Sequence, residues 1–302
     1  MNLLHKSLNS LARLLFFLLP IWSFSQTPIN GFYHKKNELT IATTYTAKSY
    51  DQFYRGTTLT DGNPAGFGKI SSSIFSFFGE YGITDWLSTT VTLPHISIKS
   101  NDGAIDPVQG KSKVSGLQDL QLFLKVKAFE KKFKDNSNIT IGAAAGTSIP
   151  VGGYDGRGIL SIGTDATTFD GSAVLQYTTS FNLFTEVQAG YSLRNNSDYD
   201  VPNAFLSSFK VGYFNDSFYA HAKIGLQNST SGFDIGSDEF VAAGGPSSLP
   251  QTEVDFTNLH FGLYVPLYKN ILGISSGYGL AIDGRNYNKE STFSFGAVYK
   301  LY

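Results

Sequence analysis

The sequence predicts an all-β fold, a closed antiparallel transmembrane β-barrel of about 12 strands. Three observations favour this fold. Apolar and polar side chains alternate along most of the chain with the two-residue period of a strand. No segment carries a sustained 3.6-residue apolar stripe with helix-capping residues. Short turns alternate with long glycine-rich loops, which is typical of bacterial outer-membrane barrels.

The segment 119–128, DLQLFLKVKA, shows the alternation most clearly. One parity holds Leu120, Leu122, Leu124, Val126 and Ala128, and the other holds Asp119, Gln121, Phe123, Lys125 and Lys127. At helical spacing the lysines would be mixed among the leucines, so a strand is the better interpretation. One face of this strand is therefore apolar, and the other is polar and charged.

The remaining strands follow from the same alternation, taken in chain order. The aligned apolar residues run over 39–47, 73–81, 87–93, 120–128, 139–149, 173–177, 183–193, 205–213, 218–226, 257–265, 272–282 and 293–301. Short turns follow the even-numbered strands and long loops follow the odd-numbered ones, so both chain ends are expected on the periplasmic side. We expect the loops at 150–171 and 228–251 to fold inward as a constriction.

Lipid is the predicted environment of the apolar face. The apolar parity continues for about nine to eleven residues in most strands, which is enough to cross a bilayer at a tilt. Aromatic residues gather beside the short turns: Tyr81, Trp86, Phe129, Phe181, Tyr213, Phe218, Tyr268 and Tyr299. A secreted sandwich or propeller is the alternative. A sheet in lipid must close, because an open edge would leave unpaired backbone groups in hydrocarbon.

The first 25 residues have the three parts of a secretory signal peptide. Lys6 and Arg13 precede an apolar run over 14–24, and small residues predict cleavage between Ser25 and Gln26. A retained membrane anchor is the weaker alternative, because Pro20 interrupts a run that is too short to span. Residues 26–37 are then expected to form a short periplasmic segment and residues 38–302 the barrel, located in the outer membrane.

Composition narrows the expected partners. The absence of cysteine excludes disulfides and thiol chemistry, and a net charge near zero gives no reason to expect nucleic acid. The final FSFGAVYKLY resembles the C-terminal signal that the barrel-assembly machinery reads, although its apolar parity ends at Leu301 rather than Tyr302. The expected partners are outer-membrane lipid, that machinery and a small solute.

The residues on the inward parity are the side chains that we expect to line the lumen. Its polar and charged residues are Lys125, Lys127, Glu186, Gln188, Arg194, Lys210, His221, Lys223, His260, Tyr264 and Asp283, interspersed with glycines that we expect to leave room for water or solute. We interpret this as a narrow polar conduit whose best cationic candidates are the four lysines. The alternative is a plugged interior of paired charges that only stabilises the barrel.

Catalytic and metal-binding signals are weak. Asn258 and His260 share the inward face, as a barrel lipase would need, but no compact serine–histidine motif is present. The acidic loop pieces at 198–200 and 233–240 lack the spacing of a calcium loop. We therefore expect neither an enzyme nor a bound cofactor or metal.

Four blocks carry a family resemblance: EYGITDWLSTTVTLP (80–94), GLQDLQLFLKVKAF (116–129), IGAAAGTSIPVGGY (141–154) and VQAGYSLR (187–194). Together they resemble the outer-membrane transporters grouped as the MetA-pathway-of-phenol-degradation family. The resemblance implies a transporter-like barrel without giving a substrate.

The predicted function is passive uptake or efflux of small solutes, aromatic or hydrophobic ones among them, through the lumen. The alternative is a non-conducting structural or surface-interaction barrel that acts through its external loops.

Overall fold

The computed structural model describes residues 29–302. The predicted leader, its cleavage site at Ser25 and Gln26, and residues 26–28 lie outside the described residues. Twelve strands form the barrel: β1 (Leu39–Tyr50), β4 (Ile70–Gly82), β5 (Leu87–Ser100), β7 (Asp119–Lys132), β8 (Asn138–Pro150), β9 (Thr167–Thr178), β10 (Leu183–Asn195), β11 (Ala204–Phe214), β12 (Tyr219–Ser229), β13 (Asp255–Tyr268), β14 (Leu272–Arg285) and β15 (Ser291–Leu301).

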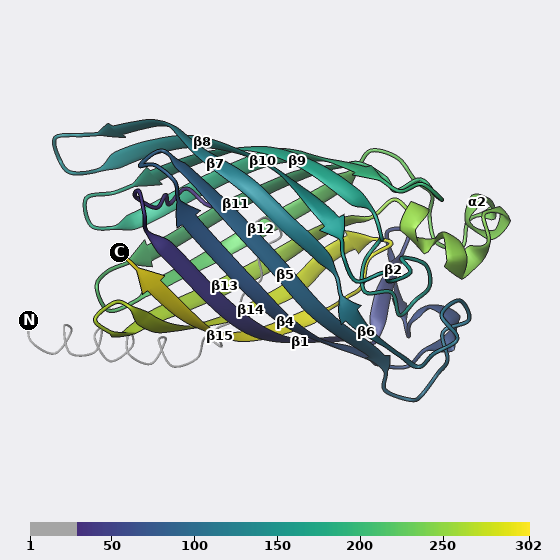
Figure 1. Cartoon of the computed structure of the whole chain (residues 1–302). Helices are drawn as coiled ribbons and strands as arrows, with labels where there is room; N and C mark the ends of the chain where they lie inside the picture. Colours follow the sequence, from purple (N-terminus) through teal and green to yellow (C-terminus); the bar gives the residue numbers. More distant parts are fainter. Residues whose placement is uncertain (1–28) are drawn as a thin grey trace, which may run out of the picture.

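The sheet is antiparallel and closed. Each strand pairs with its neighbour in sequence, and β1 pairs with β15 to complete the circle (Figure 1). The register at this seam runs from Leu39 opposite Leu301 to Ser49 opposite Ser291. The predicted closed transmembrane barrel is confirmed.

The two ends of the barrel differ as predicted. Turns of three to five residues (83–86, 133–137, 179–182, 215–218 and 269–271) lie at one end, together with the C-terminus. We call this the short-turn end. The longer connections lie at the opposite, long-loop end, on the right in Figure 1, where they carry β2 (Gln52–Arg55), β3 (Thr58–Asp61), β6 (Lys113–Leu117), α2 (Asp238–Ala242) and two 3₁₀ segments, Pro64–Gly66 and Gly245–Gln251.

The alternation within β7 decides which face points inward. Leu122 and Leu124 are 41% and 52% exposed, whereas Phe123 and Lys125 between them are 5% and 0% exposed. Such a reversal, with leucines outside and a lysine inside, is stable only where the outer surface meets lipid. The apolar outer belt continues through exposed residues such as Phe77, Val187, Phe209 and Phe295. No helix among residues 29–302 is long and apolar enough to cross a membrane.

Asn286 ties three long loops together. Its backbone adopts φ 49°, and its side-chain oxygen accepts hydrogen bonds from the amides of Gly56 and Ile235 at 2.9 Å each. Its amide nitrogen donates to the Glu253 carbonyl at 2.8 Å. One side chain therefore connects the β1–β4, β12–β13 and β14–β15 connections.

A β-bulge corrects one sequence-based assignment. The register between β13 and β14 shifts at Thr257, which lies opposite Asp283, while the next residue, Asn258, lies opposite Ala281. The extra residue, Ile282, moves Asp283 to the outer parity of Thr257, where it is exposed. The assignment of Asp283 to the lumen wall is therefore wrong.

Candidate functional site

The N-terminal segment occupies the lumen. Residues 29–37 precede β1, and sequence reasoning assigned them to the periplasm. In the structure they run from the short-turn end into the interior, where Ile29 is buried beside Phe123, Ala144 and Val174 of the inner wall. We call residues 29–36 the lumen strap.

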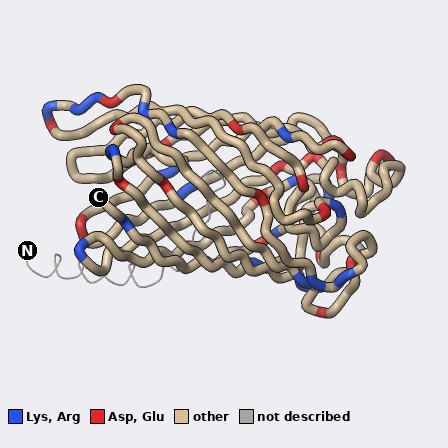
Figure 2. The backbone as a smooth tube through the Cα atoms, viewed as in Figure 1, with Lys and Arg blue, Asp and Glu red and all other residues tan. Residues whose placement is uncertain are grey.

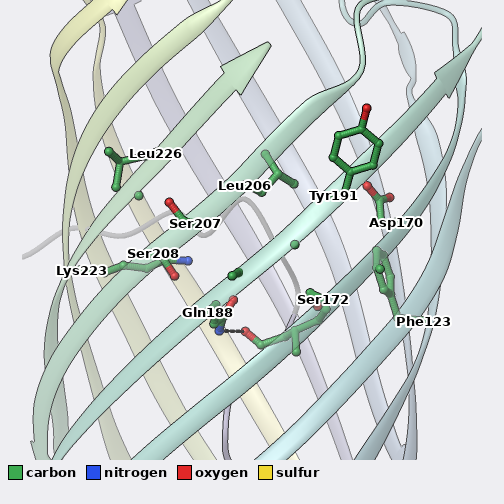
Figure 3. Close-up of a pocket in the computed structure, with 15 residues that line it drawn as sticks. Phe123, Asp170, Ser172, Gln188, Tyr191, Leu206, Ser207, Ser208, Lys223 and Leu226 are labelled. Carbon is green, nitrogen blue, oxygen red and sulfur yellow. Dashed lines mark hydrogen bonds between the residues drawn. The ribbon is translucent and has the colours of Figure 1, made fainter. Parts of the chain in front are cut away.

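Wall side chains of β7 and β10 hold the strap by its backbone. Gln188 Nε2 donates to the Ile29 carbonyl at 2.8 Å, the contact dashed in Figure 3, and the Gly31 amide donates to Glu186 Oε2 at 2.9 Å. On the opposite side, Lys125 Nζ donates to the Phe32 carbonyl at 3.0 Å. These contacts depend on main-chain atoms, so the strap sequence itself gives no sign of them.

Two buried ion pairs support the same contacts. Lys125 Nζ lies 2.7 Å from Glu80 Oε1, and Lys210 Nζ lies 2.7 Å from Glu186 Oε1. Glu80 also lies 3.4 Å from the His34 ring of the strap. The pairs keep each carboxylate partnered where water is scarce, which is the condition for a buried charge to be tolerated.

Phe32 anchors the strap in an aromatic cluster. Its ring packs edge-on against Phe184 at 5.2 Å, Phe214 at 5.6 Å and Tyr219 at 6.0 Å between ring centroids. Phe184 is fully buried and stacks on Tyr219. Edge-to-face packing of this kind adds to the area the rings bury. The cluster narrows the lumen near the short-turn end.

Two inward glycines make room for side-chain rings at places where we expected space for water or solute. A Cβ at Gly142 would collide with the Tyr33 hydroxyl, and a Cβ at Gly262 would collide with the His221 ring. Gly262 lies directly opposite His221 on the neighbouring strand, and Gly142 lies against Tyr33 of the strap. Part of the predicted free space is therefore filled.

A polar row crosses the inner wall from β10 to β13. Cross-strand pairing places Glu186 opposite Lys210, Lys210 opposite Lys223, and Lys223 opposite His260. Residues paired in this way share a face, so four predicted lumen residues lie side by side on β10 to β13. His221 lies two residues before Lys223 on β12.

Two hollows remain beside the strap. One, which we call the inner hollow, has a volume of about 470 Å³. It is bounded by the strap residues Ile29 and Asn30, by hydroxyls of β1, β4 and β5, and by Lys210, His221 and Lys223. Another of about 500 Å³ opens at the short-turn end beneath Phe32 and Phe214. Tyr219 borders both hollows. They lie in series along the lumen, with the aromatic cluster beside their junction.

Loop residues narrow the long-loop end of the lumen. Leu160 and Ile162 of the β8–β9 loop pack against Tyr50, Ile70 and Ile98, which are inward residues of β1, β4 and β5. The predicted inward fold of the 150–171 loop is thus confirmed. The β12–β13 loop joins it, because the Gly158 amide donates to the Pro246 carbonyl at 3.2 Å.

Two other predicted residues lie apart from the strap. Lys127 is near the short-turn end, a quarter exposed, with Nζ 3.0 Å from Glu130. Arg194 is at the long-loop end, where its guanidinium donates to Gln227 Oε1 at 2.9 Å. Sequence reasoning missed Glu80, although its position on the inward parity of β4, opposite Thr40, could have revealed it. Asn258 bonds to the Tyr287 hydroxyl at 3.2 Å.

Comparison with known proteins identifies the family. A family model described as "Putative MetA-pathway of phenol degradation" matches residues 51–297. The chain belongs to this family. The match covers every barrel strand except β1 and the end of β15, and it excludes the lumen strap. No curated protein matches the chain.

Comparison with solved structures finds one channel with the same fold and other chains with lower similarity. An outer membrane channel from Pseudomonas putida F1 is similar with a TM-score of 0.71 and 14% identity, over 92% of this chain and 100% of that one. The NanC porin has a TM-score of 0.47 and 12% identity, over 87% and 100%. The translocator domain of the autotransporter NalP from Neisseria meningitidis has a TM-score of 0.44 and 14% identity, over 89% and 90%.

Proposed function

We propose that this protein is an outer-membrane channel through which small solutes diffuse between the exterior and the periplasm. The observation that carries the proposal is the pair of hollows of about 470 and 500 Å³ that lie in series beside the lumen strap. A barrel that served only as a scaffold would have no need of such space. The family match and the structural similarity to an outer membrane channel also support it.

The difference in loop length between the two ends of the barrel supports an orientation in the membrane. Outer-membrane barrels have short turns in the periplasm and long loops outside. The short-turn end of this barrel would therefore be periplasmic, and the strap would enter the lumen from that side. The predicted leader would supply export. As the last strand, β15 would offer its alternating apolar face to the barrel-assembly machinery.

The side chains that line the two hollows favour solutes that combine an apolar ring with a polar group. The hollow at the short-turn end is lined by aromatic rings, including Phe32, Phe214 and Tyr264. The inner hollow adds hydroxyls and the amino groups of Lys210 and Lys223. A small aromatic acid or phenol would find a ring-lined and a polar surface along the same path. Nothing in this arrangement requires catalysis or a cofactor.

The strap would control passage through this path. It narrows the lumen at the aromatic cluster and is held by hydrogen bonds and ion pairs rather than by covalent bonds. Partial release of residues 29–33 would join the two hollows and widen the conduit. The energy for release would come from thermal motion, so transport would follow the solute gradient.

Conductance in planar bilayers tests the proposal. The purified barrel should pass small currents, and a variant lacking residues 29–33 should pass currents several-fold larger. Heat-modifiable migration in both proteins would verify that the barrel is folded. If both folded proteins pass neither ions nor small aromatic acids, the non-conducting structural barrel becomes the better account.

A further inference from the structure

A hollow on the outer surface of the barrel differs from the rest of the lipid-facing belt. It has a volume of about 680 Å³ and is lined by residues of six neighbouring strands, β14, β15, β1, β4, β5 and β6, at the long-loop end. Four lysines line it: Lys69, Lys99 and Lys113 are exposed, whereas Lys48 is partly buried and paired with Glu290 at 2.8 Å. Elsewhere the exposed outer face of these strands is dominated by apolar side chains such as Phe75, Phe77 and Phe295.

The register brings the lysines together. Lys99 on β5 lies directly opposite Lys113 on β6, and on its other side it faces Ser71 of β4. Lys69 is two residues before Ser71, and its carbonyl accepts a hydrogen bond from the Asn101 amide at 2.9 Å. Like charges in opposed positions on a sheet repel. The proximity of Lys69, Lys99 and Lys113 therefore favours the binding of an anion between their ammonium groups.

The protein supplies no such anion within the described chain. Among residues 29–302, no carboxylate lies within ion-pair distance of any of the three exposed lysines. The carboxylate nearest in sequence, Asp102, instead accepts hydrogen bonds from the Ser100 hydroxyl and the Gly68 amide. Figure 2 shows Lys and Arg segments close together along the lower right rim, under the loops.

The depth of the hollow below the lysines fits an acyl chain. Small side chains, Ala47, Ser73 and Ser97, lie opposite one another one step down the strands. The rings of Tyr45 and Phe293 border this step. Tyr45 is four residues, about 13 Å of strand, below Ser49, which shares the row of Ser71 and Lys99. Aromatic rings of outer-membrane barrels gather at the membrane interface, next to the headgroup layer.

We propose that this hollow binds a phosphate-bearing lipid of the outer leaflet, with the phosphate on Lys69, Lys99 and Lys113 and an acyl chain over Ala47 and Ser73. Ammonium groups bind phosphate through charge-assisted hydrogen bonds. Lysines that lie near a membrane surface attract anionic headgroups. The site is on the opposite face of the wall from the solute path, so it stands or falls independently of the proposed channel.

Native mass spectrometry of the detergent-solubilised barrel tests the site. The barrel is incubated with bisphosphorylated lipid A, with monophosphorylated lipid A, or with phosphatidylcholine. We expect retention in that order. The K99Q/K113Q variant should retain about tenfold less of the bisphosphorylated lipid. The K132Q/K134Q variant removes the same charge from the turn at the short-turn end and should retain as much as the wild type.

Several outcomes would overturn the inference. Equal retention of the three lipids by the wild-type barrel would do so without any variant. Unchanged retention by K99Q/K113Q would mean that the lysines only keep the strand edge from aggregating. Binding of inorganic phosphate to the wild type without retention of lipid A would assign the lysines to a free anion. Heat-modifiable migration would establish that both variants are folded.

Discussion

The ammonium of Lys125 and the carboxylate of Glu80 lie 2.7 Å apart inside the barrel, and the same ammonium donates to the Phe32 carbonyl of the lumen strap. Lys125 is fully buried. The ion pair therefore belongs to the attachment of the strap and offers little surface to a passing solute. A lysine on the inward parity of a barrel need not line the conduit.

The first prediction concerns this pair. Replacing Lys125 by methionine leaves the Glu80 carboxylate buried with only the His34 ring nearby. We expect the free energy of unfolding to fall by about 3 kcal/mol, because an unpaired buried charge is costly. Urea titration of the barrel in lipid vesicles measures this loss.

The double variant K125M/E80Q is the matched control. It removes both charges, so it should recover much of the stability lost by K125M alone. If the double variant is as unstable as the single one, the loss comes from packing of the lysine stem rather than from the charge of Glu80.

The second prediction uses the contact between Gly262 and His221. A methyl group at Gly262 would displace the His221 ring, which borders the inner hollow. We expect G262A to reduce single-channel conductance. The variant G262A/H221A removes the displaced ring and should restore it. A conductance that is unchanged in G262A would show that the inner hollow is not part of the ion path.

The third prediction concerns ion selectivity. Lys223 borders the inner hollow, whereas Lys127 lies beside Glu130 near the short-turn end. Replacing Lys223 by glutamine should lower the preference for anions, because the loss of a wall cation reduces the local attraction for them. The reversal potential in a salt gradient reports this preference. K127Q is the charge-matched control, and an equal shift in both variants would contradict the assigned path.

The fourth prediction concerns the loop tie at Asn286. Replacement by alanine removes the hydrogen bonds to the Gly56 and Ile235 amides and to the Glu253 carbonyl. We expect faster amide hydrogen exchange in residues 51–69 and 228–254, with the barrel strands unchanged. The exposed Asn101 offers a control substitution at the same end. Equal exchange in N286A and wild type would mean that backbone contacts suffice.

The fifth prediction concerns pH at the same loops. Hydrogen bonds from the Arg285 guanidinium hold the pKa of Asp234 below its ordinary value of 3.8. A carboxylate with a lowered folded pKa contributes stability above its unfolded pKa and loses it as pH falls through the folded value. The protection factors of the amides in residues 228–254, which correct for the intrinsic pH dependence of exchange, should therefore be the same at pH 5 and pH 7. Opening of these loops by pH 5 would contradict the pairing.

The alternation of apolar and polar residues was sufficient to predict the barrel, because lipid requires an apolar outer face on every strand. Leu122 and Leu124 outside and Lys125 inside follow from parity alone. Parity failed at Asp283, because a single bulge at Ile282 reverses the face and leaves no mark in composition. Alternation also identified the row from Glu186 to His260, since paired strands in register carry inward residues side by side.

The lumen strap was beyond this reasoning for a physical reason. Its attachment uses the carbonyls of Ile29 and Phe32 and the amide of Gly31, which every sequence possesses. The strap side chains that make contacts inside the barrel, such as Ile29, Phe32 and His34, are too few and too irregularly spaced to show a period. The position of the strap depends on polar wall residues far along the chain, such as Gln188. Alternation is analysed within one strand at a time, so it does not reveal contacts between distant segments.

The seam between β1 and β15 joins the first and last strands of the barrel, with Leu39 opposite Leu301. The circle cannot close until the whole strand-forming chain has been made and delivered. The strap is covalently continuous with β1, so it is present when that last pairing forms. Threading it into an already sealed cylinder would be slower than closing the wall around it. Assembly of this barrel is thus expected to resemble wrapping a sheet about a peptide more than inserting a peptide into a tube.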